Sequence, residues 1–353
     1  MTTARAIVAE TPGQLVVRDV QLTDPAPGEV LVRVDTTGIC HTDISWASGA
    51  VNDRFPVIPG HETSGVVEAV GSAVTRFAPG DRVVAALSHH CGHCYYCESG
   101  HPMLCVERTI DHPRVTDRGE HVLQGFGVGG FSTHILVGES SLVSVPDDVP
   151  LDVAALVGCA IATGLGSVFT IAQVRPGSRS LVIGAGGIGL SVLMGLHTTG
   201  AEQIVVIEPD AARREHALRL GATDALAPGD DRLHSLTDDG FDYAFETAGL
   251  TSTIEDAIQL ARPGGTIVLI GAPAAHEHFR VPALDFVATQ KRLLGCITGD
   301  LSPVSDFDRY FRMYARGMLP LDDLVSGTAT LDEAAELLSS GVPAGSIRIL
   351  VHP

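Results

Sequence analysis

The sequence predicts an α/β protein of two domains, a mainly antiparallel β domain followed by a doubly wound parallel sheet. Up to about residue 150, short β-branched runs such as LVRVDTTG, SGVVEAVG and GDRVVAAL are separated by Gly and Pro, as in antiparallel sheets. From about Gly177, apolar runs of strand length alternate with helical stretches such as DAARREHALRLG, and this alternation indicates a parallel sheet. The length of 353 residues exceeds what one compact core usually holds.

The expected domain boundaries follow from these patterns. Residues 1–160 should form the β domain and residues 161–296 the parallel sheet, with strands at SLVIG, QIVVIE, FDYAFE and GTIVLIG. After about residue 297, DFDRYFRMYARG and LDEAAELLSSG have the pattern of amphipathic helices, and SIRILVH has that of a final strand. We expect this last segment, 297–353, to return to the first domain.

Composition narrows the class of protein. The chain has 23 basic and 42 acidic residues and a net charge of −19, so nucleic acids and anionic membranes are poor partners. The opening MTTARAIVAETPG reaches Glu10 before an apolar signal core forms, and we therefore predict a cytoplasmic enzyme. The run 155–172 is uncharged, but it is rich in Gly, Ala and Thr, so a buried helix explains it more simply than a membrane span.

Four cysteines lie within fifteen residues, in the run CGHCYYCESGHPMLC. Thiolates at the spacing C-x2-C-x2-C-x7-C can converge on one tetrahedral zinc ion, and four sulfur ligands leave no position for a substrate. The pattern therefore predicts a structural zinc site on Cys91, Cys94, Cys97 and Cys105. An iron–sulfur cluster is one alternative, and disulfides are another, which the lack of an export signal disfavours.

The second domain contains a dinucleotide-binding motif. In LVIGAGGIG, Gly184, Gly186 and Gly189 have the spacing G-x-G-x-x-G, directly after an apolar strand and before a helical run. The first glycine permits a tight turn, the second lets the backbone approach a pyrophosphate, and the third allows close helix packing. The N-terminus of the helix then offers N–H groups to the phosphates. A glycine turn that binds no ligand is the alternative.

Glu208 indicates which dinucleotide is bound. It ends the next strand, nineteen residues after Gly189, where a carboxylate can accept hydrogen bonds from the ribose hydroxyls and repel a 2′-phosphate. This favours NAD over NADP. Arg213 and Arg214 follow closely and could weaken the preference.

Three more residues form a possible metal site. Cys40, His61 and Cys159 are each expected at the end of a strand or the start of a helix. Taken singly, each has an ordinary explanation as a buried side chain. Together they match the Cys2His set of a catalytic zinc ion, which keeps one position open.

At this point the chain resembles the zinc-containing alcohol dehydrogenases of the medium-chain dehydrogenase/reductase superfamily, over essentially its whole length. The resemblance rests on GICHTD at 38–43, GHE at 60–62, the cysteine lobe at 91–105, VGCAIATG at 157–164 and GAGGIG at 184–189. It implies a GroES-like β domain and a Rossmann domain. It also implies two zinc ions per chain, a catalytic one on Cys40, His61 and Cys159 and a structural one on the four-cysteine lobe.

The resemblance assigns further roles. Asp43 would hold His61, and Glu62 would assist ligand exchange at the metal. The cofactor NAD would be bound by His41, Thr163, Gly184, Gly186, Gly187, Ile188, Gly189, Glu208, Arg213, Ile270, Ala272 and Arg348. The implied partners are a small alcohol or aldehyde and a second copy of the chain as a homodimer, with a homotetramer as the alternative.

The chemistry implied is hydride transfer between an alcohol and C4 of the nicotinamide, with zinc supplying Lewis acidity. Thr42 would begin a proton relay, because a hydroxyl both accepts and donates. Many relatives carry a histidine three residues further on, whereas this chain has Ser45, which cannot hold a proton near pH 7. Water, His41 or some other group would then receive the proton.

The expected pocket favours primary alcohols and their aldehydes, because Trp46 and Leu87 make its mouth apolar beside Thr42. Two other functions stay open at this point. One is a biosynthetic reductase of an imine, a conjugated double bond or an unusual carbonyl, which the serine at position 45 permits. The other is a non-enzymatic zinc module, which the complete Cys2His set disfavours.

Overall fold

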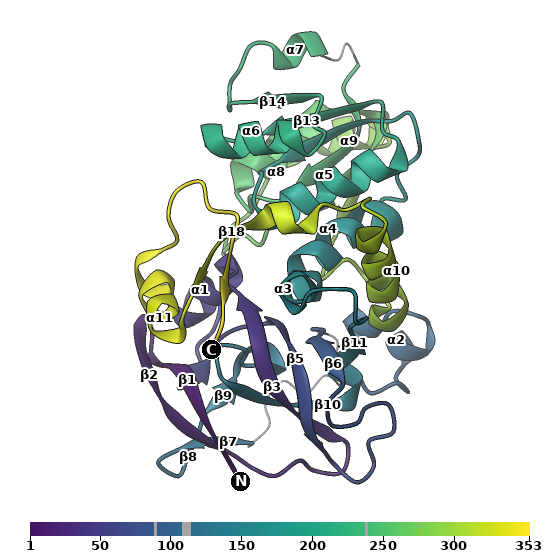
Figure 1. Cartoon of the computed structure of the whole chain (residues 1–353). Coiled ribbons are helices and arrows are strands. Elements are labelled where there is room, and N and C mark those ends of the chain that lie inside the picture. The colour runs from purple at the N-terminus through teal and green to yellow at the C-terminus, as the bar shows by residue number, and fades with distance from the viewer. Residues whose placement is uncertain (88–89, 108–113, 237–238, 275) are drawn as a thin grey trace. The chain divides into compact units, whose positions relative to one another are not determined.

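Figure 1 shows the computed structural model of the chain, which describes residues 1–87, 90–107, 114–236, 239–274 and 276–353. The chain forms two compact units. The first comprises Met1–Cys159, Ser302–Pro343 and Arg348–Pro353, and the second comprises Ala160–Leu301 and Ala344–Ile347. The C-terminal segment therefore lies with the first unit from Ser302 onward, except for the short stretch Ala344–Ile347.

Two mainly antiparallel sheets build the first unit. Its strands are β1 (Thr2–Thr11), β2 (Gln14–Leu22), β3 (Glu29–Gly38), β4 (Val57–Ile58), β5 (Glu62–Val70), β6 (Arg82–Ala85), β7 (Val115–Asp117), β8 (Glu120–His121), β9 (Leu123–Gln124), β10 (His134–Gly138), β11 (Leu142–Ser144), β18 (Val325–Ala329) and β19 (Arg348–Val351). One sheet has the order β11-β6-β5-β3-β19-β18, with β10 also paired to β3, and the other has the order β8-β7-β2-β1-β4-β9. The predicted β domain is thus confirmed.

Strand β3 shows why the sequence folds in this way. Alternate residues of a strand point to opposite faces of its sheet. Val30, Val32 and Val34 are buried in one apolar cluster, whereas Leu31 belongs to a second cluster together with Leu136. The strand is therefore covered on both faces, which holds the larger sheet in the centre of the unit.

Helices of the first unit lie around these sheets: α1 (His41–Ala47), α2 (Tyr95–Glu98), α3 (Leu151–Leu156), α10 (Pro303–Ala315) and α11 (Leu331–Ser340). The two amphipathic patterns predicted near the C-terminus correspond to α10 and α11. Helix α10 buries Phe307, Tyr310 and Phe311 on one face. Helix α11 begins with a capping box, in which Thr330 and Glu333 bond each other's backbone N–H groups.

The uncharged run lies in a continuous helical stretch, Leu151–Ile171, which passes from α3 through α4 (Ala162–Gly166). In the part of the chain that the structure describes, this is the one helix long and apolar enough to cross a membrane. About 83% of its apolar window is buried inside the protein, as in the core helix that the composition predicts. Two π-helical turns, Val157–Ile161 and Ser167–Ile171, interrupt its regular winding.

A parallel sheet forms the second unit. Its strands are β12 (Arg179–Ile183), β13 (Gln203–Ile207), β14 (Asp224–Leu226), β15 (Phe241–Glu246), β16 (Ala261–Leu269) and β17 (Arg292–Gly295), and its helices include α5 (Gly187–Thr199), α6 (Ala211–Arg219), α7 (Leu233–Leu236), α8 (Thr251–Leu260) and α9 (Ala283–Thr289). The order is β14-β13-β12-β15-β16-β17, and the neighbouring strands pair in parallel. This is the predicted doubly wound sheet, and the chain changes direction between β12 and β15, where such sheets bind ligands.

Candidate active site and cofactor site

The four cysteines of the predicted structural site lie together in the first unit. Cys94 is the N-cap residue of α2, Cys97 lies within that helix, and Cys105 follows the turn Pro102–Leu104. The Sγ–Sγ distances are 3.9 Å for Cys91–Cys97, 3.5 Å for Cys94–Cys97 and 3.9 Å for Cys94–Cys105.

These distances fit four ligands of one tetrahedral ion. Zinc–sulfur bonds of about 2.3 Å give sulfur–sulfur edges of about 3.8 Å, whereas a disulfide requires about 2.05 Å. All seven cysteines of the chain are free thiols, so the structure does not support the disulfide alternative. Within the lobe, the backbone N–H of Cys97 lowers the pKa of Cys94 to about 6, whereas burial raises the pKa of Cys91 and raises that of Cys97 to about 12. The lobe therefore fits zinc.

Cys40, His61 and Cys159 also come together in the first unit. Cys40 is the N-cap residue of α1, and His61 lies directly before β5. Cys159 does not lie at a strand end or a helix start as expected, because the apolar helix continues on both sides of it through a π-helical turn. All three residues are at most 8% exposed. Their ligand atoms, and one of Glu62, lie within 4.8 Å of one another.

Asp43 holds the histidine of this cluster. Its Oδ1 accepts hydrogen bonds from Nδ1 of His61 at 2.8 Å and from the backbone N–H of Gly60 at 3.0 Å, and its Oδ2 accepts one from the backbone N–H of Cys40 at 3.1 Å. A carboxylate on Nδ1 fixes the ring orientation and leaves Nε2 for a metal ion. One buried side chain thus positions two of the three predicted ligands.

The charges of the cluster are coupled. A hydrogen bond from the Cys159 thiol, together with the nearby Arg348 cation, lowers the pKa of Cys40 well below its usual value. The same hydrogen bond, with burial, raises the pKa of Cys159. Burial alone would lower the pKa of His61, but the charge and hydrogen bond of Asp43 raise it well above the usual value. The site therefore already favours one thiolate, as a zinc ligand set requires.

Glu62 and Arg348 form a buried ion pair beside these ligands. Nε of Arg348 lies 3.0 Å from Oε2 of Glu62, and Nη2 lies 3.2 Å from Oε1. Nη2 is also 3.7 Å from Sγ of Cys40. Burial raises the pKa of the Glu62 carboxyl, and Arg348 opposes that rise.

The residues of the expected proton relay lie on α1. Thr42 is half-buried, and its Oγ1 lies 3.6 Å from Sγ of Cys40. Ser45 is half-buried one helical turn further on, so the two side chains share a helix face. His41 is exposed at the first position of the helix.

An aromatic contact borders the cluster of Cys40, His61 and Cys159. Of its two residues, Trp46 was expected from the sequence and Phe126 was not. The ring of Phe126 lies 4.3 Å from that of Trp46 and 4.8 Å from that of His61, between ring centroids. Phe126 has φ = 56°, a left-handed conformation that is unusual for an aromatic residue. The run GFGVGG gives no pattern that would indicate it. Leu87, the other expected pocket residue, is half-buried and packs against the cluster that contains Val30.

In the second unit, the glycine motif joins β12 to α5 as predicted. Gly184 has φ = 98°, a conformation that favours glycine, and a Cβ on Gly189 would lie 1.9 Å from the carbonyl oxygen of Gly184. Gly186 is the N-cap residue of α5, which begins at Gly187 and continues through Ile188. A Cβ on Gly186 would meet open space. The motif therefore combines a tight turn and close packing with an open surface at the helix N-terminus, which suits a pyrophosphate.

Glu208 and Arg213 follow β13. Glu208 is only 4% exposed, and its carboxylate accepts hydrogen bonds from the backbone N–H groups of Ala185 at 2.7 Å and Asp210 at 2.9 Å. Nη2 of Arg213 donates to the carbonyl oxygen of Ser346 at 2.7 Å. The carboxylate is thus fixed beside the glycine turn, and the guanidinium is held by the C-terminal segment of the same unit.

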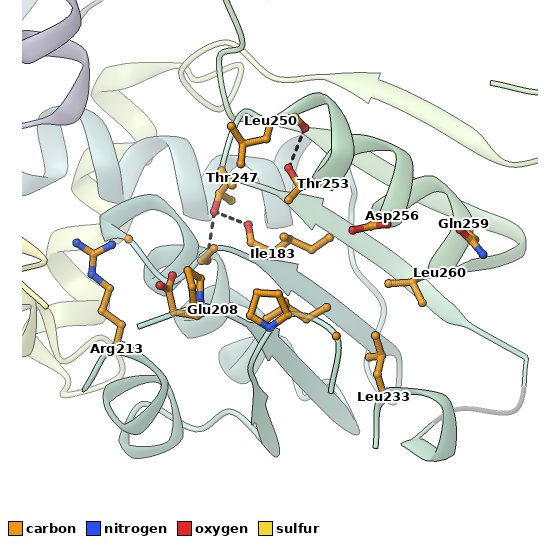
Figure 2. A pocket seen from close by; sticks show the side chains of 17 residues that line it. Ile183, Glu208, Arg213, Leu233, Thr247, Leu250, Thr253, Asp256, Gln259 and Leu260 are labelled. Atoms are coloured by element: carbon orange, nitrogen blue, oxygen red, sulfur yellow. Dashed lines mark hydrogen bonds between the residues drawn. The ribbon is translucent and has the colours of Figure 1, made fainter. Parts of the chain in front are cut away.

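A cavity of about 620 Å³ lies along these residues, and its walls include Gly184, Gly186, Glu208, Arg213 and Thr247. Figure 2 shows Glu208 and Arg213 on one side of this cavity and Asp256, Gln259 and Leu260 on the other. The volume suits a nucleotide-sized ligand. Thr163, Ile270 and Ala272 lie in the same unit outside this lining.

Glu246 supports the loop that closes one side of the cavity, and sequence reasoning missed it. Its Oε1 accepts hydrogen bonds from the backbone N–H groups of Ala248 and Gly249 and from the hydroxyl of Thr253, at 2.8–2.9 Å. Among the described residues, nothing bonds its buried Oε2. Burial raises the pKa of this carboxyl. The apolar run FDYAFE ends at this residue, which was the one available signal.

Comparisons with known proteins agree with this arrangement. Residues 26–147 match the family model of the alcohol dehydrogenase GroES-like domain, and residues 187–316 match that of the zinc-binding dehydrogenases. A geraniol dehydrogenase of Castellaniella defragrans is 36% identical over 337 residues, which cover 91% of this chain and 90% of the relative.

Solved structures of similar proteins share the whole fold. The benzyl alcohol dehydrogenase of Acinetobacter calcoaceticus has a TM-score of 0.92 and 29% identity, and the match covers 100% of this chain and 99% of that one. A zinc-binding dehydrogenase of Sinorhizobium meliloti, solved with NADP, has a TM-score of 0.87 and 28% identity, and the match covers both chains completely.

Proposed function

Because the chain belongs to the zinc-containing alcohol dehydrogenases of the medium-chain dehydrogenase/reductase superfamily, we propose that it oxidises primary alcohols, and reduces their aldehydes, with NAD as the hydride carrier. The observation that carries this proposal is the buried cluster of Cys40, His61 and Cys159, with Asp43 on the far nitrogen of the histidine. Such a set leaves one metal position for a substrate oxygen.

We propose two zinc ions per chain. The four-cysteine lobe would hold a structural ion, since four thiolates fill its coordination. Cys40, His61 and Cys159 would hold the second, and Glu62 lies close enough to take part in ligand exchange. When bound there, zinc supplies Lewis acidity toward an alcohol or carbonyl oxygen. All seven cysteines are free thiols, which supports a reducing compartment such as the cytoplasm.

The residues of α1 would handle the proton. When bound, NAD would supply the acceptor for the hydride of the alcohol C–H bond. The hydroxyl proton of the alcohol would pass to Oγ1 of Thr42, which lies 3.6 Å from Sγ of Cys40, while Thr42 releases its own proton to Ser45 on the same helix face. Serine cannot keep the proton near pH 7, so water or His41 would receive it.

Glu208 supports NAD over NADP. Two backbone N–H groups hold its carboxylate at the cofactor cavity, where it would bind the ribose hydroxyls and repel a 2′-phosphate. Arg213 lines the same cavity and would weaken this repulsion. The Sinorhizobium meliloti relative was solved with NADP, so both cofactors belong in the test.

The aromatic contact supports an apolar substrate. Trp46 and His61 both pack against Phe126 with tilted rings, and the two larger rings would cover the hydrocarbon part of an alcohol. Relatives named for geraniol and benzyl alcohol act on primary alcohols with unsaturated or aromatic groups next to the reacting carbon. We propose this class as the first to test.

We also propose a homodimer. Strand β17 is the last strand of the parallel sheet, with a neighbour on one side. The preceding α9 exposes Leu284 at 82% and Val287 at 73%. A second copy that covers this apolar helix face and the strand edge would remove both from water.

The decisive experiment measures NADH and NADPH oxidation by the zinc-loaded protein against matched panels of aldehydes, ketones, imines and conjugated enones. The proposal expects the highest kcat/KM with aromatic and allylic aldehydes and NADH. A second candidate function is the reduction of imines or conjugated double bonds. Ser45 favours it, because a proton relay without histidine is compatible with a reductase. If imines or enones are reduced and aldehydes are not, that second function replaces the first.

A further inference from the structure

The second unit contains another cavity, at the opposite end of its strands from the cofactor cavity. Its volume is about 630 Å³, and it lies at the amino ends of β12, β15, β16 and β17. Arginines dominate its lining. We call it the arginine pocket and define it by Arg175, Arg179, Arg262 and Arg292, with the carboxylates of Glu202 and Asp242 and the polar side chains of Ser178, Tyr243 and Thr266.

The charges of the arginine pocket do not cancel. Asp242 is already engaged, because it forms an ion pair with Arg262 and accepts a hydrogen bond from the backbone N–H of Arg179 at 2.8 Å. Throughout the described ranges, the guanidinium groups of Arg175, Arg179 and Arg292 have no ion-pair partner. Four arginines therefore face two carboxylates, in a chain whose net charge is −19.

Such a concentration of positive charge is unfavourable without a counter-charge. Arg175, Arg179, Arg262 and Arg292 are all exposed, so water weakens their repulsion, but like charges that line one concave surface still repel one another. A surface arginine normally spreads into solvent or pairs with a nearby acid, and this acidic chain offers 42 carboxylates for pairing. An anion held in the pocket would offset the repulsion.

The type and position of the side chains indicate the anion. Guanidinium groups bind phosphate and carboxylate oxygens through two parallel hydrogen bonds, and here they come from a loop before β12, from β12 itself, from β16 and from β17. Several anionic groups on one ligand would match such a ring better than a single one. The hydroxyls of Ser178, Tyr243 and Thr266 add donors.

The size indicates a small molecule. A cavity of about 630 Å³ is as large as the cofactor cavity of about 620 Å³, and both fall in the range of small-ligand sites. A protein partner would instead need a patch of roughly 800 Å² on each side with an apolar centre. The residues that line the arginine pocket offer no such centre.

We propose that the arginine pocket binds a small phosphorylated metabolite that carries at least two phosphate groups, at a site separate from the cofactor cavity. Strands β12 and β15 begin at the arginine pocket and end at the cofactor cavity, where Ile183 and Thr247 form part of the wall. A five-residue strand such as β12 spans roughly 15 Å, so one ligand cannot fill both cavities, and both can be occupied together.

The test is calorimetric titration of the full-length, zinc-loaded protein with inorganic pyrophosphate, at constant ionic strength and with saturating NADH. Orthophosphate, citrate and a short polyglutamate peptide are titrated in parallel. The proposal expects pyrophosphate to bind in the presence of NADH, more tightly than the other three anions. Displacement of pyrophosphate by NADH would place it in the cofactor cavity instead. If polyglutamate binds more tightly than pyrophosphate, the pocket binds an acidic protein partner. If citrate binds more tightly, the pocket binds a carboxylate ligand. Either result overturns the proposal.

Variants locate the site. Arg175→Gln/Arg292→Gln should weaken pyrophosphate binding at least tenfold and leave NADH affinity unchanged. The matched control Arg33→Gln/Arg316→Gln removes the same charge from exposed positions of the first unit and should leave pyrophosphate binding within about twofold. Equal losses in both variants would mean a general charge effect. If the double variant does not fold, the single change Arg175→Gln in the loop before β12 is measured instead. We expect it to weaken pyrophosphate binding by a smaller factor. An unchanged pyrophosphate affinity would contradict the site.

Discussion

Arg348 in the last strand is bonded to Glu62 in β5, with Nε 3.0 Å from Oε2. Both side chains are at most 7% exposed. The resemblance assigns Arg348 to the cofactor site. In this structure its guanidinium is bonded to Glu62 and lies 3.7 Å from Sγ of Cys40, so a cofactor contact would share a group that already contacts a predicted metal ligand.

Arg348→Leu should destabilise the protein by about 3–5 kcal/mol, because it leaves the Glu62 carboxylate buried without a partner. The free energy of unfolding in urea measures the loss. The double variant Glu62→Gln/Arg348→Leu should regain a large part of it, since no buried charge remains. If the single and double variants are equally unstable, the loss comes from packing rather than from the unpaired charge.

Cys94→Ser should remove one of two zinc ions per chain and lower the melting temperature, because a closed four-thiolate site contributes folding free energy. Metal analysis and calorimetry on the purified variant give both values. Cys296→Ser is the control, since Cys296 is also a free thiol but lies outside both clusters, and it should retain two ions. Two ions in the Cys94 variant would contradict the structural site.

Glu208→Ser should weaken NAD binding and raise the ratio of kcat/KM for NADP over NAD. The change removes a ribose acceptor and a charge that repels the 2′-phosphate, and it leaves Arg213 in place at the cavity. Initial rates with each cofactor measure the ratio. Glu215→Ser removes a charge from the surface of α6 and should not change it. An unaltered ratio in the Glu208 variant would remove the basis for an NAD preference.

Thr42→Val should lower alcohol oxidation by ~100-fold or more, because general acid–base catalysis contributes this much, while NAD affinity stays the same. Thr42→Ser keeps the hydroxyl and should retain most activity.

Ser45→His should raise the rate of alcohol oxidation near neutral pH, where histidine titrates. Rates measured across pH test both changes. If Thr42→Val lowers the rate of alcohol oxidation less than about tenfold, this relay is excluded. If Ser45→His does not change the rate at any pH, His41 becomes the next candidate for the proton acceptor.

Glu246 should make stability depend on pH. Burial raises its folded-state pKa above the ordinary 4.5, so its favourable contribution is present below about pH 4.5 and is lost as pH rises through the folded-state value. Glu246→Gln keeps an oxygen for the three hydrogen bonds and removes the titration. The stability of the wild type relative to this variant should therefore fall from pH 5 to pH 8. The exposed control Glu336→Gln should show no such trend, and a flat difference for Glu246→Gln would contradict the assignment.

The alternation of strands and helices predicted the fold, because periodicity records which face of each element is buried. The cluster of Cys40, His61 and Cys159 could also be predicted, since these are chemically distinctive residues in recognisable runs. Phe126 was not, because its place beside Trp46 depends on a left-handed backbone inside a glycine-rich loop. Arg262 and Arg292 lie far in the sequence from Arg175 and Arg179, and only the strand order brings them to the same pocket.

The position of β19 affects the order in which the sheets of the chain can form. This strand, Arg348–Val351, follows every strand of the parallel sheet in the sequence, yet it lies between β3 and β18 inside the larger sheet of the first unit. Until β19 is in place, β3 has an open edge at Thr37 and Gly38, where Val351 and Leu350 of β19 pair. The chain can therefore complete the parallel sheet, whose strands end at Gly295, before the larger sheet of the first unit, which begins with β3 and needs β19.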